Sequence, residues 1–283
     1  MSNISFKLSD EKISKLKDTF KDDIKQSSNE YIDTLIQNED LTISIYKSKK
    51  VVFQGKDALF FASAYLDHVN NRQAGSDEVG TGDYFGPVVV CACIIEKEDY
   101  DFIEINGITD SKKMTDEKIM SLGPTLIEKF KHSLLILDPD KYNKVHETNN
   151  MVEIKCKLHN KAYVNLISKG YSIPKAAYVD QFVNENSYYS YVKDEKEVYH
   201  DLIFETKAEE KYPAVAVASV IARYAFLSYF NKMNEAYKMT FHKGASDEVD
   251  KDAKEFVERY GEKSLGKVAK LHFKNTDKLR AML

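Results

Sequence analysis

Two adjacent acids, Asp77 and Glu78, begin the segment of the chain whose residue types are best suited to chemistry. Three glycines and then a long apolar run follow them. Carboxylate oxygens are the ligands that hard cations such as Mg²⁺ prefer, and these ions usually keep water molecules and bind substrate phosphates as well. The same residue types are equally typical of an exposed acidic turn. The pair is therefore a candidate metal site that needs support from the rest of the chain.

The backbone conformation around this pair decides whether both acids can reach one metal ion. Neighbouring residues on a regular strand point to opposite faces, so Asp77 and Glu78 could not hold one metal ion together. We therefore expect the backbone to leave the regular pleat near Glu78. Gly80 and Gly82 permit such a departure and also allow the backbone to approach a ligand closely.

The elements that must position these acids alternate between strands and helices from residue 74 onward. The run 87–95 is nearly all apolar, which predicts a strand that is covered on both faces. Helical spacing of apolar residues and caps predict the main helices, and the last of these ends at Gly261. Further strands are expected at 133–137, 175–180 and 202–205, and helices at 151–167, 214–230 and 249–260. The pattern predicts a mixed α/β domain.

The first part of the chain is predicted to form a separate, small α+β domain over residues 1–69, with the larger domain over 70–283. Ser9 is a candidate N-cap for a helix that carries apolar residues as far as Ile24. The polar segment 67–73 is the expected boundary, and the domain contains no catalytic cluster. Strands are expected at 4–8, 41–46 and 51–54, and a second helix at 58–66.

Bulk composition limits the possible classes of protein. The 283 residues carry a net charge of −4, which is not typical of a nucleic-acid binder, although the stretch 263–280 is basic. Cys91 and Cys93 fall on one face of a strand, and no CxxC pair suggests a zinc site. The chain has no signal-peptide pattern and no apolar run of about 20 residues. We therefore expect a cytoplasmic protein with no membrane association, and a monomer.

The whole run from Asp77 to Pro87, Asp-Glu-Val-Gly-Thr-Gly-Asp-Tyr-Phe-Gly-Pro, closely resembles the opening active-site motif of type 2 ribonucleases H, and in detail that of ribonuclease HIII. The resemblance continues in the same order as far as residue 276. It implies a ribonuclease H-like mixed sheet flanked by helices, after an N-terminal substrate-binding domain similar in fold to the TATA-box-binding protein. The later matching segments are Asp110-Ser-Lys-Lys, Val179-Asp-Gln-Phe, Thr206-Lys-Ala-Glu, Ala218-Ser-Val-Ile-Ala-Arg and His272-Phe-Lys-Asn-Thr.

The resemblance also implies an activity and its residues. Asp77, Glu78 and Asp180 match the acids that hold Mg²⁺ or Mn²⁺ in an endonuclease that hydrolyses the RNA strand of RNA–DNA hybrids. Two metal ions activate the attacking water and stabilise the leaving oxygen, which yields 5′-phosphate products. The turn Gly80-Thr81-Gly82 matches a Gly-x-Gly element whose backbone reads 2′-hydroxyl groups, the groups that distinguish RNA from DNA. Thr81 stands where ribonucleases HII usually carry Arg, which favours ribonuclease HIII.

The fourth acid is left open by the sequence. The family pattern has an acid four residues after the third Asp, but this chain has Asn184 there and Glu185 beside it. Glu185 is the candidate catalytic acid, and a solvated loop acid is an equally good interpretation. Glu205 and Glu209 are the competitors.

Other interpretations of residues and function stay open as well. Lys112 and Ser219 are candidate substrate contacts, but Lys112 could equally be a solvated charge. Ser219 and Arg223, one turn apart, could orient substrate or acids, and a structural ion pair of Arg223 is the equal alternative. One alternative activity is incision at single ribonucleotides in DNA, as in ribonuclease HII. Another is binding of hybrids without catalysis, and a third is an unrelated metal-dependent phosphatase.

Overall fold

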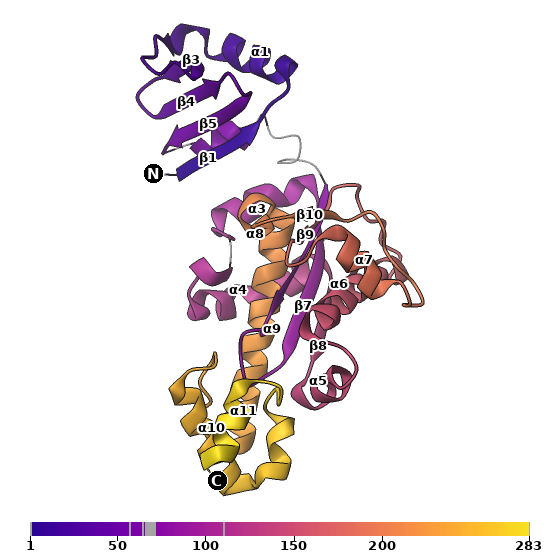
Figure 1. The fold of residues 1–283 in the computed structure, drawn as a ribbon. Coiled ribbons are helices and arrows are strands. Elements are labelled where there is room, and N and C mark those ends of the chain that lie inside the picture. Colours follow the sequence, from indigo (N-terminus) through magenta and orange to yellow (C-terminus); the bar gives the residue numbers. More distant parts are fainter. Residues whose placement is uncertain (1, 57, 64, 66–71, 110, 283) are drawn as a thin grey trace. The chain divides into compact units, whose positions relative to one another are not determined.

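The computed structural model describes residues 2–56, 58–63, 65, 72–109 and 111–282. The chain divides into two compact units, residues 1–71 and 72–283, which are called the N-terminal and C-terminal units here (Figure 1). The boundary predicted at 69/70 lies outside the described residues.

The N-terminal unit is a five-stranded antiparallel sheet with two helices. The strand order is β1-β5-β4-β3-β2, and Leu16, Ile43 and Phe53 lie in its core. The helix α1 begins after Ser9, whose side chain accepts a hydrogen bond from the Lys12 amide, as predicted. It ends at Thr19, so Ile24 belongs to a strand instead, and strand β3 was not predicted. The elements are β1 (Ser2–Lys7), α1 (Asp10–Thr19), β2 (Ile24–Lys25), β3 (Ile32–Gln37), β4 (Leu41–Tyr46), β5 (Lys50–Gly55) and α2 (Ala58–Ser63).

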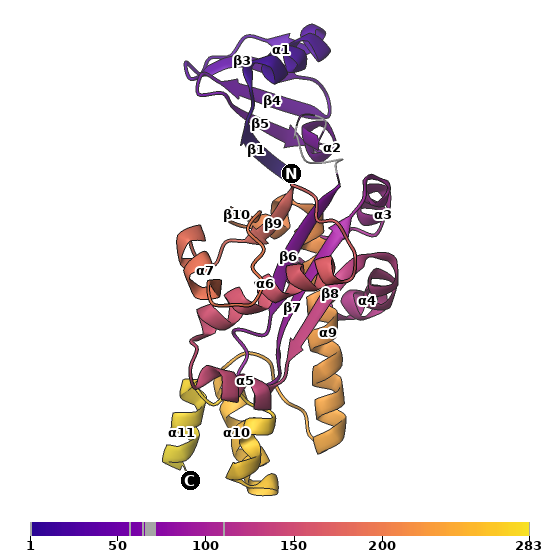
Figure 2. The same cartoon turned by 90° about the vertical axis from the view of Figure 1, so that its right-hand side faces the viewer.

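The C-terminal unit is built on a mixed five-stranded sheet of order β10-β9-β6-β7-β8 (Figure 2). The pairs β6–β7 and β7–β8 are antiparallel, whereas β9 is parallel to β6 and β10 is parallel to β9. This arrangement puts the carboxyl ends of β6, β9 and β10 at one edge of the sheet. The strands are β6 (Gln73–Val79), β7 (Val88–Ile95), β8 (Lys131–Leu137), β9 (Ala177–Asp180) and β10 (Ile203–Glu205).

Two long helices cover the two faces of this sheet, as Figure 1 shows on either side of β7. Alternate residues of β7 separate accordingly: Cys91 and Cys93 pack with α9 (Pro213–Tyr237), and Ala92 packs with α6 (Met151–Ser168). Every residue of β7 is buried, as predicted for a strand covered on both faces. The helix α9 is long and apolar enough to cross a membrane, but its most apolar window is 72% buried inside this unit.

The C-terminal unit contains further helices besides α6 and α9, and most of them were not predicted. The helix α10 was predicted, and it ends at Gly261 with a positive φ of 80°. The additional helices are α3 (Tyr100–Ile105), α4 (Asp116–Lys129), α5 (Pro139–His146), α7 (Glu185–Val192), α8 (Ala208–Lys211), α10 (Asp247–Tyr260) and α11 (Lys274–Met282).

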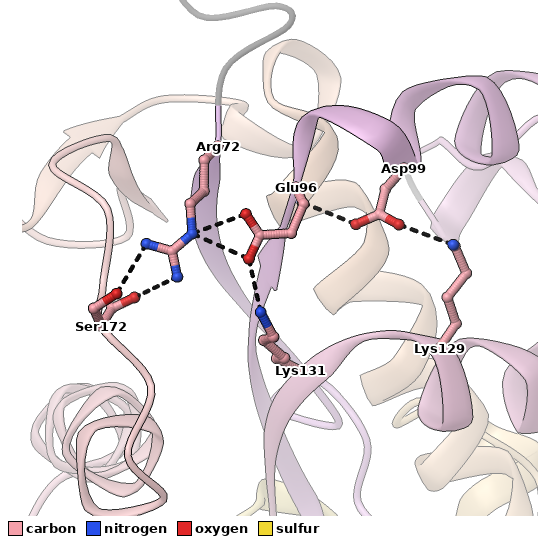
Figure 3. A network of polar contacts seen from close by, with 6 residues as sticks. All are labelled: Arg72, Glu96, Asp99, Lys129, Lys131 and Ser172. Atoms are coloured by element: carbon pink, nitrogen blue, oxygen red, sulfur yellow. Dashed lines mark hydrogen bonds and ion pairs between the residues drawn. The ribbon is translucent and has the colours of Figure 1, made fainter.

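A polar network fixes the start of the C-terminal unit (Figure 3). The Arg72 guanidinium donates to the carbonyl oxygen of Ser172 at 2.7 Å and lies 2.9 Å from Glu96. Lys131 contacts the same Glu96 carboxylate at 2.8 Å. Burial acts to raise the pKa of Glu96, but the bonds from Lys131 and Arg72 outweigh it and lower that pKa. The network therefore ties the beginning of β6 to the end of β7, the start of β8 and the loop before β9.

Candidate metal centre and active site

The register of the sheet brings Asp77 and Asp180 side by side. Strands β6 and β9 pair in parallel as far as Ser76 with Val179, and each acid is the next residue of its strand. Asp180 pairs in turn with Glu205 of β10. Register partners point to the same face, so three carboxylates follow one row across the edge where the parallel strands end.

Asp77 is buried on the face that α9 covers. Its side chain is 8% exposed and accepts hydrogen bonds from the Ser219 hydroxyl and from the Glu78 amide, the latter at 2.8 Å. The Ser111 hydroxyl lies 2.7 Å from that of Ser219 and completes a short chain of hydroxyls. Burial first, and then the negative charges of Glu78 and Asp180, raise the pKa of Asp77 well above its usual range against these hydrogen bonds. A cation near Asp77 would stabilise its ionised form and so lower its pKa.

Glu78 points to the other face, toward α6. Its Oε1 lies 2.5 Å from the Lys155 ammonium, and its Oε2 lies 2.9 Å from the His159 Nε2. The second ring nitrogen of His159 lies 2.8 Å from the Ser76 hydroxyl, which shares the Glu78 face. Burial acts to raise the pKa of Glu78, but His159 and then Lys155 outweigh it and lower that pKa.

The expected departure from the pleat near Glu78 is absent, and that prediction is wrong. Strand β6 keeps an unbroken register with β7 through Glu78 opposite Val90 and Val79 opposite Val89. The ladder of hydrogen bonds with β7 is regular, so the two neighbouring acids stay on opposite faces.

Asp180 is anchored at the end of its strand. Its Oδ1 accepts a hydrogen bond of 3.1 Å from the Ala208 amide, the first residue of α8. The Gln181 amide donates to the Glu205 carbonyl oxygen and continues the pairing with β10. These contacts hold the Asp180 carboxylate beside Asp77 on the α9 face.

The donor set fits a hard divalent cation in its chemistry. Asp77 and Asp180 offer carboxylate oxygens on one face, and their mutual repulsion favours a bound cation. Glu78 is directed away by Lys155 and His159. Accordingly, no group of three or more His, Cys, Asp or Glu side chains within the described ranges lies close enough to hold a metal ion. The two aspartates would therefore hold the cation, and Glu78 would join them only by leaving Lys155.

The glycine-rich turn follows these acids directly. Gly80 has a φ of +96°, and a Cβ there would lie 2.1 Å from the Pro87 carbonyl oxygen, so only glycine fits. Thr81 and Gly82 form the turn, and Gly82 is exposed with open space around it. The turn leaves backbone groups accessible beside Asp77.

Residues 270–276 of the C-terminal segment contact the chain just after the glycine-rich turn. The Lys270 amide donates to the Tyr84 carbonyl oxygen, and its buried ammonium donates to the Gly86 carbonyl oxygen at 2.6 Å. Burial lowers the pKa of Lys270 to about 7. The Thr276 hydroxyl lies 3.0 Å from the Tyr84 hydroxyl. The matching segment 272–276 therefore braces the turn.

The candidate fourth acids are spread over both faces. Glu185 is exposed at the first position of α7, and Asn184 caps that helix by accepting from the Ser187 amide. Glu205 lies in register with Asp180 and pairs with Lys211 at 2.9 Å. Glu209 is partly buried in α8. The sheet thus brings Glu205 into the row of acids, whereas Glu185 starts a helix that packs on α6.

The other candidate residues occupy different environments. Ser219 is only 1% exposed and faces Asp77, so it is placed to orient this acid. Lys112 is exposed in a short 3₁₀ helix, and Asp110 of the same motif lies outside the described residues. Arg223 pairs with Asp116 at 3.2 Å.

Lys155 and His159 were missed by the sequence reasoning. They stand one helical turn apart on α6, where i and i+4 side chains share a face. That spacing was visible in the sequence, but nothing local indicated that the partner would be an acid 77 or more positions earlier in the chain.

Comparisons with known proteins agree with this arrangement. The family model described as ribonuclease HII matches residues 74–276, and a domain of unknown function (DUF3378) matches residues 3–78. Ribonuclease HIII from Streptococcus mutans is 37% identical, with 100% of this chain and 99% of the relative covered. Ribonuclease HIII from Lactococcus lactis subsp. cremoris is 39% identical, with 98% and 97% covered.

A solved structure extends the likeness to the fold. The crystal structure of Bst-RNase HIII in complex with Mn²⁺ has a TM-score of 0.76 and 30% identity, and 99% of each chain is covered. The predictions of the family and of a ribonuclease H-like α/β fold after a small α+β unit are confirmed. This chain belongs to the ribonuclease HIII branch of the type 2 ribonuclease H family of metal-dependent endoribonucleases.

Proposed function

We propose that this protein hydrolyses the RNA strand of RNA–DNA hybrids at the edge of the sheet formed by β6, β9 and β10. The observation that carries the proposal is the placement of Asp77 beside Asp180, with a turn in which only glycine fits at position 80 following Asp77 along the chain. A buried Asp77 beside a partly buried Asp180, followed along the chain by a glycine turn that is exposed at Gly82, suits a cation-assisted attack on a phosphodiester whose sugar is read by that backbone.

Each residue of the site has its own role in the proposed reaction. Asp77 and Asp180 hold Mg²⁺ or Mn²⁺, which when bound supplies Lewis-acid activation of water and stabilisation of the leaving oxygen. Ser219 orients the Asp77 carboxylate through its hydroxyl. The turn at 80–82 contacts 2′-hydroxyl groups of the RNA strand, and Lys112 contacts phosphate as an exposed point charge. Glu78, which points toward α6, is the third acid of the proposed metal centre.

The finer assignments are part of the same proposal. The N-terminal domain predicted over residues 1–69 supplies substrate affinity, and the protein acts as a cytoplasmic monomer. The crystal structure of Bst-RNase HIII in complex with Mn²⁺ supports a divalent cation. Thr81, at the middle of the turn, favours cleavage of continuous hybrids. Cleavage at single embedded ribonucleotides would instead be a ribonuclease HII-like activity.

One substrate comparison tests the proposal. Labelled duplexes with a continuous RNA strand, with a single ribonucleotide and with DNA alone are incubated with the purified protein in Mg²⁺ and, separately, in Mn²⁺. We expect cleavage of the continuous hybrid with 5′-phosphate products. Preferred cleavage at the single ribonucleotide would favour the ribonuclease HII-like alternative. Binding of the hybrid without cleavage in either metal would favour a non-catalytic binding module.

A further inference from the structure

Lys155 of α6 places an ammonium against the Glu78 carboxylate, one of the acids proposed for the metal centre. Its ammonium lies 2.5 Å from the Glu78 Oε1 and 3.8 Å from the centre of the Phe182 ring. The side chains of Lys155 and Glu78 are 13% and 12% exposed. A cation that is held by a carboxylate and an aromatic face, and is largely shielded from water, is a strong local counter-ion.

A divalent cation and this ammonium compete for the same oxygen. The ammonium occupies one of the two lone pairs of Glu78 Oε1 and weakens this oxygen as a metal ligand, because two cations on the same carboxylate repel each other. The other oxygen, Oε2, contacts His159, which is itself fixed by Ser76. His159 therefore contacts the second oxygen of the carboxylate whose first oxygen Lys155 holds.

We propose that Lys155 is a built-in counter-ion that holds Glu78 on the α6 face in the metal-free protein and must release it when a divalent cation binds. This inference rests on the proposed function, because it takes Glu78 as a residue of the metal centre. It also makes Lys155 a positioning residue that sets the metal affinity.

The same helix offers a matched control. Lys157 lies two residues further on α6 and pairs with Glu153 at 3.0 Å and Glu195 at 3.9 Å instead of with the acids of β6. Replacing either lysine by methionine removes one positive charge from α6 and keeps most of the apolar stem. Only Lys155→Met removes the charge that competes with the metal ion.

The test measures Mn²⁺ binding directly, by titration with electron paramagnetic resonance of the free ion, and metal-free thermal unfolding in chelator. We expect K155M to bind Mn²⁺ at least about tenfold more tightly than the wild type, because a repelling charge has been removed. We also expect its metal-free Tm to fall by about 3 to 8 °C, because Glu78 loses its counter-ion. K157M should stay within about twofold of the wild-type affinity.

The opposite signs of the two effects separate this role from simple support of the fold. Mn²⁺ binding by K155M that equals or falls below the wild-type affinity would overturn the inference. If K155M does not fold, the ¹⁵N-detected ammonium signal of Lys155 in the wild type decides instead, since Mg²⁺ should abolish the ion-paired signal. A persistent signal at saturating Mg²⁺ would refute the release.

The proposed function can fail separately. A wild-type protein that binds Mn²⁺ but leaves the hybrid intact would contradict the proposed activity. Tighter Mn²⁺ binding by K155M would still support the counter-ion in that case.

Discussion

Asp77 and Glu78 are neighbours in the chain but face opposite sides of strand β6. Asp77 contacts Ser219 of α9, whereas Glu78 contacts Lys155 and His159 of α6. The central sheet therefore divides the acidic motif, and each half has its own supporting helix. Because the two halves sit in different electrostatic surroundings, their pKa values move in opposite directions, and the two acids should respond differently to mutation and to pH.

Replacing Asp77 by Asn should abolish cleavage of the RNA–DNA hybrid. The change keeps the shape of the side chain but removes the charge that faces Asp180, so we expect a loss of at least about 10³-fold in kcat. Single-turnover cleavage at saturating Mg²⁺ and Mn²⁺ measures it, with circular dichroism as the check on folding. Asp33→Asn, in the N-terminal unit at an ion pair with Lys17, is the control that removes a carboxylate elsewhere. Full activity of the Asp77 variant would contradict the assigned role.

The raised pKa of Asp77 predicts that the metal-free protein loses stability as the pH rises. An unfolded Asp titrates near about pH 4, whereas burial and the Glu78 charge hold the folded pKa of Asp77 higher. The folded state therefore binds this proton more tightly. Its stabilising contribution is complete below about pH 4 and is lost as the pH rises through the folded pKa.

Glu78 contributes with the opposite sign. Its folded pKa is lowered, so its contribution is present above its unfolded pKa and is lost as the pH falls through the folded one. The two windows do not overlap, which lets one variant isolate Asp77. In chelator, the Tm of Asp77→Asn should depend less on pH than the wild-type Tm between about pH 4.5 and 8. Parallel curves in that range would show that Asp77 has an ordinary pKa.

Ser219→Ala should weaken catalysis without unfolding the protein. The Ser219 hydroxyl is a hydrogen-bond donor to the Asp77 carboxylate and helps to keep it ionised. Its loss should raise the pKa of Asp77 further and move the acidic limb of the pH–rate profile upward, with about a tenfold lower rate near neutral pH. Ser228→Ala on the same helix, where the hydroxyl contacts Met120, is the control. An unchanged pH profile would mean that Ser219 only packs the core.

Much of the central architecture follows from the sequence because its signals are local. The β7 run is apolar at every position, and α1, α6 and α10 carry the cap or terminator that defines their ends. Ser9 accepts the expected hydrogen bond at the start of α1, and Asn150 accepts a corresponding bond from the Glu153 amide at the start of α6. The family motif named Asp77 and Asp180 for one metal centre, which stays a prediction, and the parallel register of β6 and β9 puts the two acids side by side.

The rest depended on tertiary contacts that no local pattern reveals. The course of β6 past Glu78 is set by its ladder with β7, which outweighed the freedom that Gly80 and Gly82 provide. The direction of Glu78 is set by charges on α6 that are distant in sequence. The sequence around Ser219 indicated only an apolar helix. The contact of Ser219 with Asp77 arises because α9 packs very closely on β6. A Cβ at Gly75 of β6 would lie 2.4 Å from the Val215 amide nitrogen of α9.

The two glycines of the turn should respond differently to the same substitution. Gly80→Ala forces a residue with a Cβ into a φ of +96° and against the Pro87 carbonyl oxygen, so it should lower the free energy of unfolding by about 2–4 kcal/mol. Gly82→Ala meets open space at an ordinary φ and should leave that free energy within about 0.5 kcal/mol of the wild-type value. Chemical denaturation of both variants measures the difference.

Activity then tests the role of the turn in reading RNA. A methyl group on Gly82 reduces how closely the exposed backbone can approach a 2′-hydroxyl, so Gly82→Ala should raise KM for the hybrid while the fold stays intact. Gly266→Ala, at a position outside the turn where a Cβ would meet only ordinary van der Waals contacts, controls for a loss of glycine that is not at the site. Wild-type KM and kcat in Gly82→Ala would argue against close backbone approach at this position.

The fourth acid can be identified by three matched variants, Glu185→Gln, Glu205→Gln and Glu209→Gln. Glu205 is in register with Asp180, which is next to Asp77, and so belongs to the row of carboxylates at the sheet edge. Glu185 is exposed at the start of α7 and has to reach across from the α6 side. We therefore expect Glu205→Gln to reduce kcat by about 10²-fold and Glu185→Gln to change it by less than about threefold.

Mn²⁺ affinity separates a ligand from a structural acid among these variants. Glu205 also pairs with Lys211, so its replacement could act through that ion pair alone. Lys211→Met breaks the same pair but leaves the carboxylate in place, and it should retain both metal affinity and most of the activity. Equal losses in Glu205→Gln and Lys211→Met would assign Glu205 to structure. A large loss confined to Glu185→Gln would show instead that α7 supplies the fourth acid from the face of the sheet that also carries Glu78.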